Sequence, residues 1–213
     1  MFGKSPRRGL PTHLGSNLGR AGGKGGVGLG DDREREAALA ALMVAYQDGD
    51  AMAFEKLYGE VAGPMLGYLR SLTRDATRAE DLLQETFLQV HRVRHTYERG
   101  RPVKPWLYAI ARNVFLMYRR AAGRLLRHEG LADDELPDVP VPPEVESLAD
   151  RDHVQKALAR LPPDRREALL LHHVMGLSFQ EVGAVLGLTA GAAKLRAHRG
   201  VVELREFLRP EAT

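Results

Sequence analysis

Apolar side chains recur at helical spacing over the first half of the chain. Between about Asp32 and Arg120 they are separated mostly by three or four positions, as in Phe54, Leu57, Tyr58 and Val61 and then Leu66, Leu69 and Leu72. Few runs of β-branched residues interrupt this pattern, so strands are not expected. Breaks between helices are predicted at Gly63-Pro64, Thr73-Arg74-Asp75 and Gly100-Arg101-Pro102. The pattern predicts a bundle of about four helices.

A second helical module is predicted from about Asp150 to Leu208, where apolar periodicity resumes at Val154, Leu158, Leu161 and Leu169 to Leu171. The segment from Glu129 to Asp150 holds eight carboxylates, four prolines and no lysine or arginine, which is typical of an extended linker. The first 30 or so residues are rich in glycine and basic. We therefore expect an all-α protein with a tail (1–32), a helical bundle (33–122), an acidic linker (123–149) and a C-terminal helical domain (150–213).

The C-terminal module has the spacing of a helix-turn-helix. Ser178 followed by Glu181 forms a capping box, and Gly187 suits the sharp turn that ends this helix. Thr189 then caps the next helix, which carries Lys194, Leu195, Arg196, His198 and Arg199. Basic side chains of this kind donate hydrogen bonds to phosphates and base edges. A three-helix bundle with a solvated basic face remains the alternative for this segment.

The helix predicted over AEDLLQETFLQV has a distinct polar face. Asp81, Gln84, Glu85 and Leu88 fall on one arc of the helix, opposite an apolar arc. A solvated face usually mixes both signs of charge, whereas this one presents carboxylates, an amide and a leucine. The pattern favours docking onto a basic partner helix.

Downstream, the segment RPVKPWLYAIARNVFLMYRR predicts a helix with two stripes. We expect Trp106, Ile110, Val114 and Met117 to point inward, leaving Tyr108, Arg112, Phe115 and Arg119 on another surface. Alternating rings and arginines suit single-stranded nucleic acid, because rings stack on unpaired bases while arginines hold the backbone. The alternative is that the aromatic residues belong to the core and the arginines are solvated.

Composition narrows the possible functions. The 213-residue chain has a net charge of +3 and no cysteine, which excludes disulfides, a cysteine nucleophile and thiolate metal ligands. GGKGGVG lacks the ending of a phosphate-binding loop, and His91 and His95 lack a third metal ligand. We therefore expect no enzyme activity, metal or cofactor. Without a long apolar segment, we expect a cytoplasmic protein with no membrane insertion.

Taken in order, these motifs resemble the extracytoplasmic-function (ECF) branch of the bacterial sigma-70 family. AFEKLYGEVAGPMLGYLRSLT, AEDLLQETFLQVHR and RPVKPWLYAIARNVFLMYRR look like the family's region 2, and the segment from Leu161 to Leu208 looks like region 4. The resemblance implies a transcription initiation factor that brings core RNA polymerase to promoters. Its implied partners are the β′ clamp helices and β flap of the polymerase, promoter DNA and an anti-sigma factor.

The resemblance also implies roles for individual residues. Asp81, Gln84, Glu85 and Leu88 would contact the polymerase. The minus-ten element would be melted and bound by Tyr97, Trp106, Tyr108, Arg112, Asn113 and Arg119, with an extruded base held by the loop from Thr96 to Pro102. Lys194, Leu195, Arg196, His198 and Arg199 would contact the minus-35 element. The acidic linker would enter the active-centre cleft of the polymerase, or serve as a plain spacer.

The chain departs from the family pattern at Ala192 and Leu195, where the family commonly has a polar residue and a serine. Leu195 either contacts a thymine methyl or marks weak recognition of the minus-35 element. A rival interpretation is a helix-turn-helix regulator whose N-terminal bundle senses a ligand or dimerises. Binding to core polymerase distinguishes the two interpretations.

Overall fold

The computed structural model describes residues 29–128 and 149–209, and every regular element within these ranges is helical. The N-terminal bundle contains four α-helices and a short 3-10 turn, namely α1 (Leu29–Gln47), α2 (Ala51–Thr73), α3 (Ala76–Val93), η1 (Arg94–Thr96) and α4 (Val103–His128). The C-terminal module contains α5 (Ala149–Arg160), α6 (Pro163–Leu169), the π-helical turn η2 (Leu170–Val174), α7 (Phe179–Leu186) and α8 (Ala190–Phe207). The all-α prediction is confirmed. Residues 1–28 of the predicted tail and 129–148 of the predicted linker lie outside the described residues, whereas α4 extends to His128, six residues into the predicted linker.

Local sequence signals set most of the helix ends. The Asp50 side chain accepts hydrogen bonds from the amides of Met52 and Ala53 at the start of α2, and Asp75 caps α3 in the same way. Arg74 adopts a left-handed conformation between these helices, with φ of 55°. The break predicted at Gly63-Pro64 is wrong, because α2 continues through Pro64. Burial of Val61 and Met65 on either side stabilises the helix there despite the lost backbone hydrogen bond.

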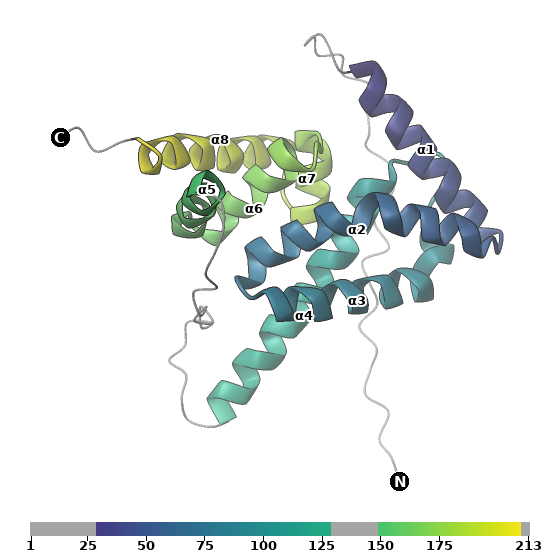
Figure 1. The fold of residues 1–213 in the computed structure, drawn as a ribbon, viewed down its shortest axis with the longest axis horizontal. Helices are drawn as coiled ribbons and strands as arrows, with labels where there is room; N and C mark the ends of the chain where they lie inside the picture. The colour runs from purple at the N-terminus through teal and green to yellow at the C-terminus, as the bar shows by residue number, and fades with distance from the viewer. Residues whose placement is uncertain (1–28, 129–148, 210–213) are drawn as a thin grey trace.

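The first bundle is built around α2, which packs against α1, α3 and α4. Its fully buried side chains include Met43, Leu57, Met65, Tyr68 and Leu69. Helix α4 passes behind α2 and α3, and its C-terminal half projects beyond them (Figure 1). Among the described residues, no helix is long and apolar enough to cross a membrane.

The two stripes predicted for α4 are partly wrong. Tyr108 and Phe115 are buried in the core, whereas Met117, expected inside, is 65% exposed. The reason is that α4 contacts α1, α2 and α3 on one side and α7 of the second module on another. Met117 lies on the outer side of α4, because its neighbours Leu116 and Tyr118 pack against the core.

Helices α7 and α8 form the predicted helix-turn-helix. Ser178 makes both hydrogen bonds of the capping box with Glu181, and Gly187 ends α7 with φ of 71°. The Thr189 hydroxyl accepts a hydrogen bond from the Ala192 amide at the start of α8. A Cβ atom added at Gly183 would lie 2.7 Å from the Leu188 carbonyl oxygen, so glycine permits the close crossing of α7 with the turn. Each of these features was predicted from the sequence except the role of Gly183.

The two modules share one hydrophobic core. The cluster that contains Leu57 and Leu107 continues without a break into Met175, Leu177 and Val182 of the second module. Helix α7 lies directly against α4. A smaller cluster joins α5, α6 and η2 to the C-terminal half of α8.

Candidate polymerase-binding and nucleic-acid-binding surfaces

The polar face of α3 is open to solvent as predicted. Asp81, Gln84 and Glu85 are exposed, and Leu88, the next residue along this face, is 53% exposed. The opposite side of the helix, with Leu83 and Phe87, is buried in the bundle. Asp81 and Glu85 form exposed ion pairs with Arg78 and Arg92 at 3.4 and 3.5 Å. Exposed pairs of this kind contribute little stability, so the carboxylates are available to a basic partner.

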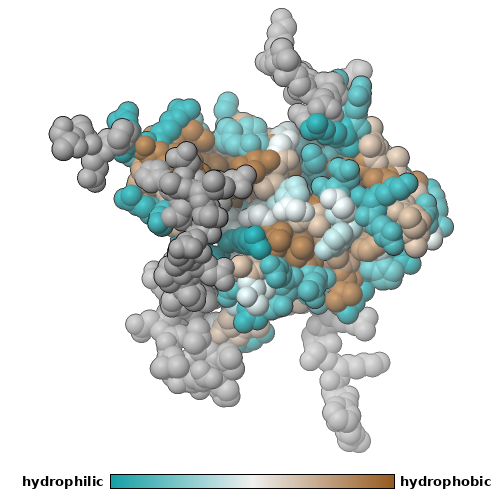
Figure 2. Space-filling model, viewed as in Figure 1, coloured by the Kyte–Doolittle hydropathy of each residue, from teal (hydrophilic) through white to brown (hydrophobic). Residues whose placement is uncertain are grey.

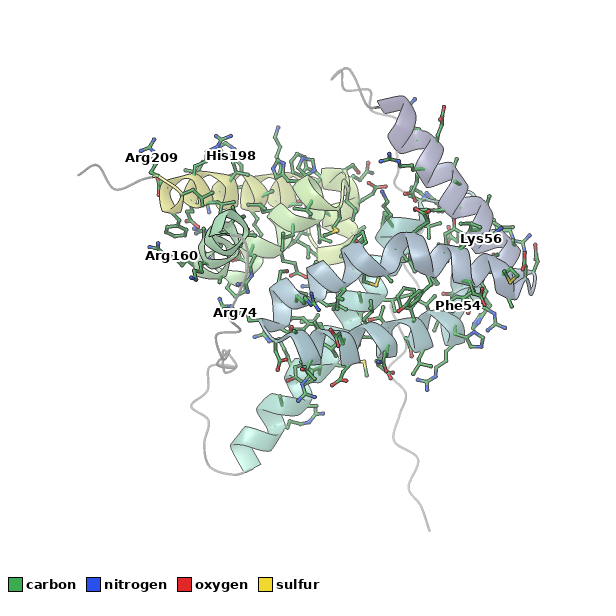
Figure 3. The ribbon with its side chains drawn as sticks, in the orientation of Figure 1. Phe54, Lys56, Arg74, Arg160, His198 and Arg209 are labelled. Atoms are coloured by element: carbon green, nitrogen blue, oxygen red, sulfur yellow. The ribbon has the colours of Figure 1, made fainter. Side chains whose placement is uncertain are left out.

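Helix α8 presents a basic outer face. Ala193, Ala197 and Gly200 are buried against the module, whereas Lys194, Leu195, His198 and Arg199 are exposed. His198 points away from the other helices of the module (Figure 3). The exposed side chains therefore lie opposite the side of α8 that packs on the module.

Within this basic group, Arg196 forms an ion pair with another residue of the chain. Its guanidinium lies 3.5 Å from the Asp164 carboxylate of α6, and it is only partly exposed. An ion pair between Arg165 and Glu203 joins the same two helices. These contacts fix the orientation of α8 on α6. The C-terminal half of α8 carries the exposed Val202, and an apolar patch covers this part of the helix (Figure 2).

The loop before α4 is packed inward. The Tyr97 ring is buried, its hydroxyl donates a hydrogen bond to the Arg101 carbonyl, and its centroid lies 5.5 Å from that of Trp106. Burial raises the pKa of the Tyr97 hydroxyl, so it remains a donor at neutral pH. The Glu36 carboxylate of α1 accepts hydrogen bonds from the first amides of α4, at Val103 and Lys104. Tyr97, the candidate for holding an extruded base, is therefore buried in this arrangement.

The α4 residues expected to bind the melted strand differ in how far they are buried. Tyr108 is 4% exposed, and its hydroxyl lies 2.8 Å from the Met175 sulfur in the second module. Arg112 is partly exposed and pairs with Glu167 of α6, at 3.0 Å. Asn113 and Arg119 are partly exposed, and the Arg119 guanidinium lies over the Phe115 ring. The expectation that Tyr108 faces solvent is wrong, because the second module covers it.

Clusters with the chemistry of metal sites are absent from the residues that the structure describes. His91, one of the pair at helical spacing, instead forms a 2.6 Å hydrogen bond with the Tyr46 hydroxyl. His172 stacks on Phe179 and bonds the Leu177 carbonyl. These histidines therefore have structural partners.

Comparison with known proteins finds two family models that match this chain. Sigma-70 region 2 matches residues 57–125, and Sigma-70, region 4 matches residues 151–204. RNA polymerase sigma factor CarQ of Myxococcus xanthus is 42% identical, over 78% of this chain and 95% of its own. The ECF RNA polymerase sigma factor SigE of Mycolicibacterium smegmatis is 41% identical, over 81% of this chain and 68% of its own. The chain belongs to the ECF branch of the sigma-70 family.

A solved structure agrees with this assignment. The sigma factor RpoE from Bartonella quintana, crystallised with the anti-sigma factor NepR, superimposes with a TM-score of 0.63 and 29% identity. The match covers 75% of this chain and 98% of that chain. In this ECF sigma factor, the open face of α3 and the partly covered face of α4 both belong to region 2, and the basic face of α8 belongs to region 4.

Several important residues were missed at the sequence level. Glu167 accepts hydrogen bonds from both Tyr68 and Arg112 of region 2, the former at 2.7 Å. Burial and the negative charge of Glu167 raise the pKa of Tyr68 well above its ordinary range, which keeps its hydroxyl protonated as a donor. Tyr68 and Glu167 are 99 positions apart. Periodicity within a helix carries no information about such a pair.

Proposed function

We propose that this ECF sigma factor captures core RNA polymerase through the α3 face defined by Asp81, Gln84, Glu85 and Leu88. The observation that carries this proposal is the exposure of all four residues on one side of a helix whose other side is buried. The carboxylates suit the basic β′ clamp helices, and Leu88 adds an apolar contact. The β flap is the proposed partner of region 4. The protein itself supplies no catalytic group, and acts in the cytoplasm where polymerase and promoters meet.

For the minus-ten element, the partly exposed residues of α4 are the strongest candidates. Arg112, Asn113 and Arg119 lie on the part of the helix that the bundle leaves accessible. Their side chains offer donors to phosphates and to bases of the melted strand. Trp106, partly buried against Tyr97, supports the adjoining loop. Tyr97 and Tyr108 shape this surface from within and contribute to DNA binding directly only if the region rearranges.

For the minus-35 element, we propose that α8 lies in the major groove. Lys194, His198 and Arg199 are exposed, Arg196 is oriented by Asp164, and Leu195 presents an apolar side chain that fits a thymine methyl. Ala192 offers no polar contact. The promoter specificity of this protein therefore differs from that of relatives with polar residues at these positions.

The boundaries proposed above (1–32, 33–122, 123–149 and 150–213) divide the chain into tail, region 2, linker and region 4. The RpoE neighbour was solved with an anti-sigma factor. We propose that a protein of this class also binds the present chain and prevents its use by polymerase.

The test is transcription in vitro from a library of genomic fragments, with core polymerase in the presence and absence of this protein. We expect new start sites that share a minus-ten and a minus-35 sequence. If the protein binds such fragments tightly and specifically without polymerase, and adds no start sites, the helix-turn-helix regulator is the correct interpretation.

A further inference from the structure

Helix α1 and the turn that follows it hold the backbone of the loop before α4 at several points. We propose that Glu36, Gln47 and Asp48 are positioning residues, which keep the loop of residues 96–102 in the conformation that discriminates between bases extruded from the melted minus-ten strand. The inference rests on the proposed binding of this strand by region 2. It assigns a part in promoter recognition to α1, which precedes the residues that match Sigma-70 region 2, 57–125.

Gln47, the last residue of α1, holds the start of the loop. Its side-chain nitrogen donates hydrogen bonds to the carbonyl oxygens of Arg94 at 2.7 Å and Tyr97 at 2.9 Å. These carbonyls belong to η1 and to the residue that caps it, so one amide group fixes the direction in which the chain leaves η1. The side-chain oxygen of Gln47 is buried without a hydrogen-bond partner among the described residues. Because such an acceptor costs stability, the amide is better explained by the loop conformation that it enforces.

Glu36, earlier on α1, holds the end of the loop. Its carboxylate accepts hydrogen bonds from the amides of Val103 and Lys104, the latter at 3.3 Å. Amides in the first turn of a helix have no partners within the helix, and the helix dipole favours a negative charge beside them. Pro102, which directly precedes α4, has no side-chain acceptor that could cap the helix. The first turn of α4 is therefore fixed by a side chain of α1.

The tip of the loop is restrained by a third contact. Arg99 forms an ion pair with Asp48, which directly follows α1, and both side chains are exposed. An exposed pair contributes little to stability, so its main effect is on the position of the tip. Within the loop, the Tyr97 hydroxyl donates to the Arg101 carbonyl, and Gly100 adopts a φ of 83° that glycine tolerates without strain. Contacts at the start, tip and end therefore define the backbone of the whole loop.

A loop that is already ordered is suited to discriminate between bases. Thr96 and Glu98 are exposed on it and are accessible to an extruded base. Extruding a base costs the free energy of unstacking, which contacts with the loop must offset. A fixed loop loses little further conformational entropy on binding, whereas a loop released by α1 would first have to be ordered. A released loop would also adopt other conformations that accept other bases, so discrimination would fall.

The experiment uses the full-length protein bound to core polymerase, and a fluorescent single strand with the minus-ten sequence of a promoter that supports transcription. Each position of the strand carries the four bases in turn, and discrimination is the affinity for the preferred base divided by the mean affinity for the other three. Glu36→Leu removes the acceptor for the α4 amides, whereas Glu36→Gln retains a side-chain oxygen. Glu34→Leu, at an exposed position of the same helix, is the matched control.

Two further variants test the other contacts. Gln47→Leu removes the donor to the two carbonyls. Asp48→Ala removes the ion pair at the tip and changes only an exposed side chain, so it decides the test if another variant does not fold. Glu55→Ala, at an exposed position of α2, is its matched control. Circular dichroism verifies that each variant is folded, and affinity for core polymerase is measured separately.

We expect the parent to show at least about 10-fold discrimination at the position whose base is extruded. Glu36→Leu and Gln47→Leu should lower it to about twofold or less, and Asp48→Ala should lower it by about half, at this position only. Affinity for polymerase should stay within about twofold of the parent value. Glu36→Gln and both controls should behave as the parent does.

Discrimination that is unchanged in Glu36→Leu, Gln47→Leu and Asp48→Ala would overturn the proposal. So would an equal loss at every position of the strand, because that result indicates a general defect of region 2 and not a displaced loop. Failure of Glu36→Gln to retain discrimination would exclude the amide hydrogen bonds as the cause. A parent complex that discriminates at no position of the strand would instead contradict the proposed function of region 2.

Discussion

Helices α3 and α4 belong to the same bundle and both carry residues proposed to bind a partner, but they present them differently. The polar face of α3 is fully on the surface, with Leu88 53% exposed beside two carboxylates. The corresponding part of α4 is covered by region 4, and Tyr108 is 4% exposed. The difference shows that packing against the second module, and not the sequence of the helix alone, decides which proposed binding residues are exposed.

The largest expected effect comes from reversing the charges on the open face. Asp81→Arg together with Glu85→Arg should weaken binding to core polymerase by at least about 100-fold, or about 2.7 kcal/mol, because the variant repels a basic partner. Glu55→Arg with Glu60→Arg, on the exposed side of α2, is the matched control and should change the affinity by less than about twofold. Fluorescence anisotropy of labelled sigma factor measures both. Equal affinities for the two double variants would contradict the assignment of the α3 face.

Region 4, which covers part of α4, is perturbed most directly by a substitution of Gly183 in α7. Gly183→Ala places a Cβ atom 2.7 Å from the Leu188 carbonyl oxygen and should destabilise region 4 by about 1–3 kcal/mol. Gly191→Ala is a suitable control, because a Cβ atom there meets nothing within 4 Å, and alanine should stabilise α8 by up to about 1 kcal/mol. Hydrogen exchange of the α7 and α8 amides measures the change. Loss of polymerase binding through α3 in Gly183→Ala would show that the two surfaces are not independent.

The exposed face of α8 gives a smaller effect that depends on salt. Lys194→Ala should weaken promoter binding by the holoenzyme and lower the slope of log affinity against log salt concentration by about 1, because one phosphate contact is lost. Arg209→Ala, beyond the end of α8 (Figure 3), should leave the slope unchanged. An unchanged slope in Lys194→Ala would show that Lys194 contacts no phosphate, and would contradict the proposed DNA-binding face of α8.

The smallest expected effect concerns His173, which lies in η2 just before Met175. Partial desolvation, with help from the charges of His172 and Arg205, lowers the pKa of His173 below its ordinary value of 6.5, although the residue is exposed. The unfolded chain therefore binds a proton more readily at this site, and the stability contributed by neutral His173 is lost as the pH falls below about 6.5. His173→Gln should show a slightly smaller drop in melting temperature than the parent between about pH 7.5 and about pH 5. Parallel curves would contradict a contribution from this histidine.

The features predicted best from the sequence are those encoded within one helix or one turn. The open face of α3 follows from the positions of Asp81 and Glu85 opposite Leu83 and Phe87. The capping box at Ser178 and the left-handed Gly187 fix the helix-turn-helix by local hydrogen bonds. Each of these signals extends over a few residues, so periodicity and capping rules detect it.

The face of α4 could not be predicted in the same way. Two interpretations of its aromatic residues were open, and burial of Tyr108 and Phe115 agrees with the core alternative. Helical periodicity assumes one buried side, whereas α4 is packed by its own bundle and by α7. The Arg112 and Glu167 partners lie 55 positions apart. Tertiary packing also overrides the helix-breaking signal of Pro64.

The central claim is that the α3 face captures polymerase, and that binding of the melted strand depends on this capture. It is tested most directly by measuring the affinity of the parent protein for a single strand from the minus-ten region, alone and with saturating core polymerase. A sample of core polymerase with the Asp81→Arg, Glu85→Arg double variant measures the background, namely strand binding by polymerase that has not captured the sigma factor. We predict weak strand binding by the free protein and binding at least about 10-fold tighter with polymerase, absent from the background sample. Equally tight strand binding with and without polymerase would contradict the account.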